Sequence, residues 1–326
     1  MTVATQIEVL DLRHFSARQL RPLLEAEARL WENRLRWDYR SSTELLLQYL
    51  DSRILPGFVA LDHGRICGYT FCVYEGQKAV VGDAYAVTKD GASNLAVTQL
   101  LLRHLLELVE NSPNVDRVES QLLLYDTGAL EEAFLEAGFM QHLRLFMECD
   151  LAQRPAAVEL KELPPGLEVV SWSSSYYQAA AELIHDAYAG HIDARINDQY
   201  CSLHGSLRFL HNIVRFPGCG VFDPNQSWLL VDRNRNMLAG MLLCSRVAPD
   251  VAHITQLCVR STARGLGLGQ MLLAHSMTQL DRAGFAAITL TVTESNRPAV
   301  TLYEASGFHV RYRFDAMVLD RSTKPR

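Results

Sequence analysis

Residues 261–284 read STARGLGLGQMLLAHSMTQLDRAG, and this stretch decides the fold of the second half of the chain. It follows an apolar, β-branched run over 251–259, which predicts a strand. A helix is predicted over 267–283, because apolar or small residues recur there on one helical face. These residues are Gly269, Leu273, Met277 and Leu280. Gly284 is typical of a helix end.

The segments around this stretch complete a mixed α/β domain. Ranges 167–172, 227–232 and 237–247 predict strands, the last two joined by a turn at Asn234, Arg235 and Asn236. A helix is predicted over 176–188, a strand over 286–292, a helix over 298–306 and a closing strand over 308–319. The order of strand, glycine loop, helix and strand indicates one parallel crossover in a sheet that is otherwise built from hairpins.

The glycine loop has the chemistry of a phosphate site. It consists of Arg264, Gly265, Leu266, Gly267, Leu268 and Gly269. Backbone N–H groups at the start of a helix have no intrahelical acceptor and attract anions, and glycines let a pyrophosphate approach closely. The spacing does not match the dinucleotide fingerprint, and no G-K-[ST] follows. An alternative interpretation is that the glycines only relieve crowding between helix and strand.

A second motif downstream supports a specific ligand. Residues 294–308 read ESNRPAVTLYEASGF. Together with the glycine loop, this segment closely resembles the GNAT superfamily of acyl-CoA N-acyltransferases. In that family R/Q-x-x-G-x-G/A cradles the coenzyme pyrophosphate, and N-x-x-A-x-x-x-Y-x-x-x-G-F follows. The positions matching the two patterns are Arg264, Gly267, Gly269, Asn296, Ala299, Tyr303, Gly307 and Phe308.

The resemblance implies acetyl-CoA, or another acyl-CoA, as the acyl donor. The backbone of Leu257, Cys258 and Val259 would bind the pantetheine arm, with Asn296 among the residues at the coenzyme. Tyr303 would protonate the departing thiolate as a general acid, and its alternative role is that of a core tyrosine. His253 and Glu294 are the two candidates for the general base, His253 slightly ahead.

The two halves of the chain repeat each other. An offset of 172 residues pairs Gly68 with Gly240 and Cys72 with Cys244. Further along the chain the offset becomes 169, which pairs Gly138 with Gly307. The first half lacks the site residues, since positions 92–97, which correspond to 264–269, read ASNLAV, and under the second offset Tyr303 corresponds to Phe134. We therefore expect a degenerate GNAT-like domain over 1–151, a Pro-containing linker over 152–166 and a catalytic GNAT-like domain over 167–326. This tandem layout resembles that of the mycothiol synthase family.

A long stretch over 190–226 is expected to lie over the acceptor, as in the GNAT layout. Tyr188, His191 and Asp193 are the tentative acceptor residues. Because this insertion would narrow access, a small-molecule amine is favoured over a protein lysine or N-terminus. A protein that binds acyl-CoA without catalysis, as a sensor or interaction module, is the alternative from another class.

Composition excludes several other classes. The formal net charge is −6 and no block of basic residues occurs, so neither nucleic acid nor an anionic membrane is an expected partner. Residues 1–12 lack the apolar core of a secretory signal, and no 18-residue apolar run occurs, so we expect a cytoplasmic protein. The seven cysteines contain no C-x-x-C pair, and no metal site is expected, although Cys201, His204 and His211 lie close in sequence.

Overall fold

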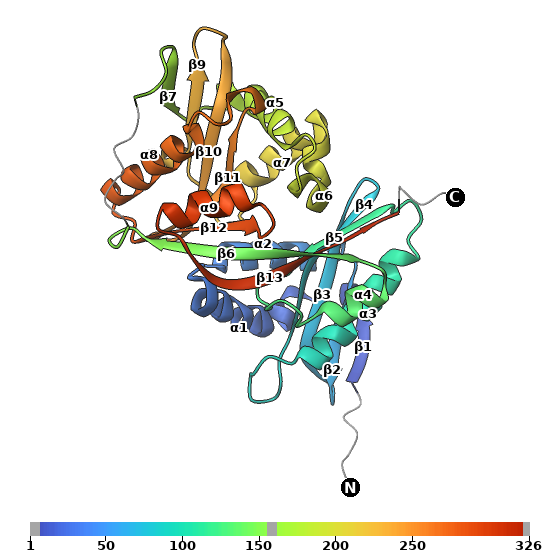
Figure 1. Cartoon of the computed structure of the whole chain (residues 1–326). Helices are drawn as coiled ribbons and strands as arrows, with labels where there is room; N and C mark the ends of the chain where they lie inside the picture. Colours follow the sequence, from blue (N-terminus) through green and yellow to red (C-terminus); the bar gives the residue numbers. More distant parts are fainter. Residues whose placement is uncertain (1–6, 155–161, 322–326) are drawn as a thin grey trace. The chain divides into compact units, whose positions relative to one another are not determined.

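The computed structural model describes residues 7–154 and 162–321, and the chain forms two compact units (Figure 1). One unit contains Met1–Leu35, Tyr39–Leu143 and Arg313–Arg326, and the other contains Arg36–Asp38 and Arg144–Tyr312. Each unit has a mostly antiparallel sheet with one parallel strand pair and flanking helices, which confirms the predicted fold class. Within the described ranges no helix has the length and apolar character needed to cross a membrane.

The first unit has the strand order β1-β2-β3-β4-β5-β13. Helices α1 and α2 pack on one face of its sheet and α3 on the other. Its elements are β1 (Ile7–Asp11), η1 (Leu12–His14), α1 (Ala17–Leu35), α2 (Arg40–Asp51), β2 (Gly57–Asp62), β3 (Arg65–Glu75), β4 (Lys78–Ala86), α3 (Leu95–Glu110), β5 (Arg117–Gln121), α4 (Glu131–Glu136) and the end of β13 (His309–Asp320).

The second unit has the strand order β6-β12-β11-β10-β9-β7, with β8 paired to β10. Figure 1 shows α8 and α9 on one side of this sheet and α5 and α7 on the other, in agreement with the two clusters of buried side chains. Its elements are the end of β6 (Met140–Asp150), β7 (Leu167–Ser171), η2 (Ser174–Tyr176), α5 (Tyr177–Tyr188), α6 (Asp193–Ile196), η3 (Asp198–Cys201), α7 (Leu203–Arg215), β8 (Val221–Phe222), η4 (Pro224–Gln226), β9 (Trp228–Asp232), β10 (Met237–Ala248), β11 (Val251–Val259), η5 (Ser261–Ala263), α8 (Leu268–Arg282), β12 (Ala287–Thr293), α9 (Arg297–Ala305) and the start of β13.

The units do not coincide with the two halves of the sequence. Residues 144–150 of β6 and residues 36–38 belong to the second unit, whereas residues 313–320 of β13 belong to the first. The end of β6 pairs with β12, and the end of β13 pairs with β5. The domain boundary at 152–166 stays a sequence prediction, and residues 155–161 of that linker lie outside the described residues.

The structure repeats in the two units as the sequence offset suggests. β4 and β5 pair in parallel over four residues, and so do β11 and β12. A register shift interrupts β3–β4 beside Cys72 and β10–β11 beside Cys244. Added Cβ atoms at Gly68 and Gly240 would lie 2.9 Å from Leu101 and 3.0 Å from Leu272, so both glycines let a helix approach the sheet closely.

Two carboxylates are buried together in the first unit. Glu27 of α1 is 1% exposed and Asp83 of β4 is 6% exposed. The Tyr69 hydroxyl donates to Glu27 Oε2 at 2.6 Å and lies 3.3 Å from Asp83 Oδ2. Burial, followed by the charge of Asp83, raises the pKa of Glu27 well above its ordinary value of 4.5. Burial also raises the pKa of Asp83. Folding therefore favours the protonated acids.

This pair predicts a pH-dependent stability that Glu27→Gln should reduce. Because the folded-state pKa is raised, the folded chain retains protons that the unfolded chain releases above about pH 4.5. The free energy of unfolding should thus fall with rising pH, by up to about 1.4 kcal/mol per pH unit for one group. Urea unfolding at pH 5 and pH 8 should show a smaller fall in Glu27→Gln. Glu32→Gln, at an exposed position of the same helix, should behave like the wild type, and equal slopes in all three proteins would contradict the prediction.

Candidate active site

A gap between two parallel strands lies at the centre of the second unit. β11 pairs with β12 only from Val251 to Ile254, whereas its pairing with β10 extends to Val259. A register shift in the β10 ladder leaves Thr255 as an extra residue at the point of divergence, as expected where a bulge bends a strand. The edge of Leu257, Cys258 and Val259 that faces away from β10 therefore presents backbone donors and acceptors.

The glycine loop lies between the end of β11 and the start of α8. Gly265 and Gly267 have φ values of 79° and 76°, a left-handed conformation that favours glycine. A Cβ atom at either position would meet nothing within 4 Å, and at Gly269 its nearest neighbours would be 3.7 Å away. Relief of crowding therefore does not explain these glycines. Their positive φ values explain Gly265 and Gly267. The empty space around an added Cβ at both positions leaves the surface of the loop open.

The start of α8 has no internal cap. Gly267 occupies the N-cap position and has no side chain that could accept from the first helical amides. The N–H groups of the first turn, Leu268 included, are thus available to an external anion. The Arg264 guanidinium donates to the Ala187 carbonyl at the end of α5, and Asp186 accepts from the Ser261 amide at 2.7 Å. These two contacts fix the loop against α5.

Tyr303 lies on α9 at the other side of the gap. It is 8% exposed, and burial, followed by the charge of Asp193, raises the pKa of its phenol. Among the described residues its hydroxyl has no hydrogen-bond partner. The side chain of Asn296 caps α9, accepting from the Ala299 amide at 3.4 Å. The structure therefore gives Asn296 a part in placing the helix that carries Tyr303.

The three predicted acceptor residues lie together. Tyr188 and His191 form an edge-on ring contact with centroids 5.3 Å apart, and the Asp193 amide donates to His191 Nδ1 at 3.2 Å. Tyr200 stacks on Tyr188 at 4.1 Å. Burial is the largest cause of the raised pKa of Tyr188 and of Tyr303, and the charge of Asp193 also raises both.

Arg144 is the site residue that sequence reasoning missed. It lies on β6, opposite Thr293 of β12, and its Nη1 is 3.2 Å from Asp193 Oδ1. The sequence repeat alone assigns Arg144 to the first half of the chain. The only signal in the sequence was an arginine in a strand otherwise rich in apolar residues.

The two candidate bases occupy different positions. His253 lies on the paired part of β11 and is 3% exposed. Its Nδ1 is 2.9 Å from Thr289 Oγ1, its ring meets Trp37 edge-on at 4.8 Å, and burial lowers its pKa to about 3. Within the described ranges no contact joins it to Tyr303. Glu294 is half-buried and directly follows β12.

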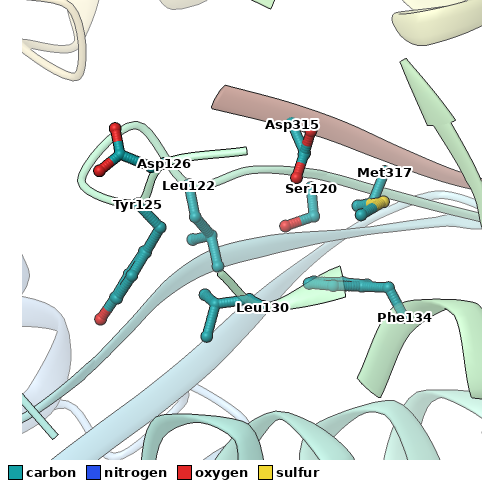
Figure 2. A pocket seen from close by; sticks show the side chains of 8 residues that line it. All are labelled: Ser120, Leu122, Tyr125, Asp126, Leu130, Phe134, Asp315 and Met317. Carbon is teal, nitrogen blue, oxygen red and sulfur yellow. The ribbon is translucent and has the colours of Figure 1, made fainter. Parts of the chain in front are cut away.

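The helix of the first unit that corresponds to α8 has a capped start. α3 begins at Leu95 with Asn94 as its N-cap, and the Asn94 side chain accepts from the Val97 amide at 3.3 Å. A cavity of about 20 Å³, room for roughly one water, lies where Phe134 replaces the tyrosine (Figure 2). Figure 2 shows it lined by Ser120, Leu122, Tyr125, Asp126, Leu130, Phe134, Asp315 and Met317.

Comparisons with known proteins agree with this geometry. Residues 207–308 match the model of the acetyltransferase (GNAT) family. The mycothiol acetyltransferase of Thermomonospora curvata is 42% identical over 97 residues, which cover 29% of this chain and 31% of that protein. The [ribosomal protein bS18]-alanine N-acetyltransferase of Escherichia coli K12 is 35% identical over 65 residues, covering 20% of this chain and 44% of that protein. The chain thus spans less than half the length of either relative.

Two solved structures share the fold of the whole chain. A GCN5-related N-acetyltransferase from Sphaerobacter thermophilus superposes with a TM-score of 0.67 at 16% identity, covering 98% of this chain and 97% of that one. A tandem GNAT protein from the clavulanic acid biosynthesis pathway superposes with a TM-score of 0.58 at 15% identity, covering 98% of this chain and 100% of that one. At such identities the likeness concerns the fold alone.

Proposed function

We propose that the second unit, which contains the segment 207–308 that matches the acetyltransferase (GNAT) family, transfers an acetyl group from acetyl-CoA to a small-molecule amine. The observation that carries the proposal is the gap beyond Ile254, where β12 leaves β11. The uncapped start of α8 follows one strand, and the helix bearing Tyr303 follows the other.

The residues of the gap fit the parts of acetyl-CoA. The amides of the first turn of α8 would bind the pyrophosphate. The free edge of Leu257, Cys258 and Val259 would hydrogen-bond the amides of the pantetheine arm. The thioester would then lie near Tyr303, whose phenol stays protonated at neutral pH and can protonate the leaving thiolate.

An amine acceptor agrees with the side chains beyond the thioester. Direct attack on a thioester requires positioning and a deprotonated amine, and no nucleophile from the protein. We do not assign the base to His253, because its lowered pKa makes it a poor proton acceptor at neutral pH. Glu294 stays a prediction from the sequence.

The segment between α5 and β9, which is predicted to lie over the acceptor, favours a small acceptor. α6, η3 and α7 form most of the stretch between α5 and β9, and Tyr188, His191 and Asp193 are only partly exposed. A protein acceptor is the rival, since one relative's name specifies an alanine of a ribosomal protein.

The test is turnover and stoichiometry with the full chain. Calorimetry should give one acetyl-CoA per chain, because α3 of the first unit has its own cap at Asn94. Release of the coenzyme thiol should be faster with a panel of small amines than with peptides bearing an N-terminal alanine. Faster reaction with the peptides would favour the protein acceptor, whereas binding without turnover would favour a sensor.

A further inference from the structure

The two oxygens of Asp193 have different surroundings. Oδ1 accepts from Arg144 Nη1 at 3.2 Å and from the Thr293 hydroxyl. Oδ2 lies 3.5 Å from His191 Nδ1, but that nitrogen already accepts from the Asp193 amide. A neutral His191 therefore has its proton on Nε2 and cannot donate to Oδ2. Apart from His191 Nδ1, no donor within the described residues lies within hydrogen-bond distance of Oδ2, and the Asp193 side chain is 15% exposed.

Arg144, on strand β6, holds Oδ1 of Asp193 in place. Besides Asp193, its guanidinium donates to Thr293 Oγ1 at 2.8 Å and to Thr291 Oγ1 at 3.2 Å. The Arg144 side chain is 12% exposed, and three contacts fix its planar group in one orientation. The pairing of β6 with β12 therefore brings Arg144 to the position from which it orients Asp193.

The ring of His191, whose Nδ1 lies 3.5 Å from Asp193 Oδ2, connects Asp193 to a pair of tyrosine rings. Tyr188 and Tyr200 are stacked with an interplanar angle of 16°, and Tyr188 also contacts the ring of His191. A carboxylate oxygen with unused acceptor capacity beside aromatic rings suits an ammonium group, which forms charge-assisted hydrogen bonds and cation–π contacts. An uncharged acceptor would gain no electrostatic attraction from the Asp193 carboxylate.

Resting on the proposed function, we infer that Asp193 Oδ2 binds the ammonium group of a cationic primary amine and removes a proton from it. Arg144 is the positioning residue that orients Asp193 for this step. The inference concerns the acceptor class and the base, neither of which the glycine loop or Tyr303 determines.

The ammonium gives one proton to Asp193, and the neutral amine attacks the thioester carbonyl, forming the C–N bond. Collapse of the tetrahedral intermediate breaks the C–S bond, and the Tyr303 hydroxyl protonates the thiolate. The nitrogen loses its second proton, which restores the tyrosine, and Asp193 releases its proton to solvent. The products are the amide, the free coenzyme thiol and one proton.

The experiment compares full-length variants with putrescine and tyramine as cationic acceptors and aniline as a neutral one. Asp193→Asn should lower kcat/KM for the cationic amines by about 100-fold or more, and the loss should shrink as pH rises and the free amine becomes more abundant. Arg144→Met should lower it by about 10-fold, with partial recovery in Arg144→Lys. In the Asp193→Asn background Arg144→Met should have little further effect, because the two residues act as a unit.

A matched ion pair in the same unit serves as the control. Arg154 Nη2 donates to Asp281 Oδ2 at 2.9 Å at the far end of α8, so Arg154→Met and Asp281→Asn should leave kcat/KM unchanged. Asp193→Glu, which keeps the carboxylate, should retain more activity than Asp193→Asn.

Separate outcomes identify which proposal fails. If acetyl-CoA does not bind the wild type, the proposed function and this inference fall together. If it binds but only aniline or no amine is acetylated, the inference is overturned while the coenzyme site stands. Activity of Asp193→Asn within threefold of the wild type, or equal losses in Asp193→Asn and Asp193→Glu, would also overturn it.

Discussion

Replacing Gly267 with glutamate is expected to abolish measurable binding of acetyl-CoA. Gly267 is the N-cap of α8 and has a φ of 76° with no atom within 4 Å of an added Cβ. The new side chain would therefore point into open space, and its carboxylate would compete with the pyrophosphate for the first helical amides. The left-handed backbone costs about 1–2 kcal/mol for a residue other than glycine, which is less than a typical domain stability.

The opposite end of α8 supplies a matched control for this substitution. Gly284 also has a positive φ, 81°, and open space around an added Cβ. Gly284→Glu thus introduces the same strain and the same charge, but away from the proposed phosphate site. By calorimetry Gly267→Glu should lose at least about 100-fold in affinity, equivalent to about 2.8 kcal/mol, and Gly284→Glu should bind as the wild type does. Wild-type affinity in Gly267→Glu would refute the loop assignment.

Local patterns predicted the elements of the second unit closely. The strand over 251–259 has the predicted bounds, and the helix predicted over 267–283 is α8 (Leu268–Arg282). These elements follow from short-range signals such as alternation, amphipathic spacing and glycine stops.

Contacts between distant segments could not be predicted in the same way. Arg144 meets Asp193 and Thr293 only because β6 pairs with β12, and a repeat offset assigns that strand to its own half. His253 looked suitable as a base because it precedes the coenzyme segment along the strand. The bulge at Thr255 comes after it, however, so His253 remains in the paired part of β11, buried against Trp37. Strand pairing and bulges depend on tertiary structure.

Removing the hydroxyl of Tyr303 should reduce turnover by about 100-fold or more with little change in coenzyme affinity. Tyr303→Phe keeps the ring that packs against Phe308 at 5.7 Å, so the fold and the gap should persist. What is lost is the proton for the leaving thiolate, and positioned general acids contribute about 10²–10⁴-fold to rates. Because the pKa of this phenol is raised, the hydroxyl should stay protonated throughout pH 6–9 and cause no loss of kcat in that range.

A second tyrosine of the same unit controls for the chemical change itself. The Tyr177 hydroxyl donates to the Leu207 carbonyl at 3.4 Å, and Tyr177→Phe should cost about 1 kcal/mol of stability at most while leaving turnover intact. Steady-state kinetics and calorimetry on both variants separate catalysis from binding. Unchanged kcat in Tyr303→Phe would exclude the acid role. A loss confined to KM would instead mean that the hydroxyl binds the ground state and transition state equally. The chain itself has a phenylalanine, Phe134, at the position that corresponds to Tyr303, in the unit where Asn94 caps α3, so the predicted acid and the proposed phosphate site are both missing from that unit.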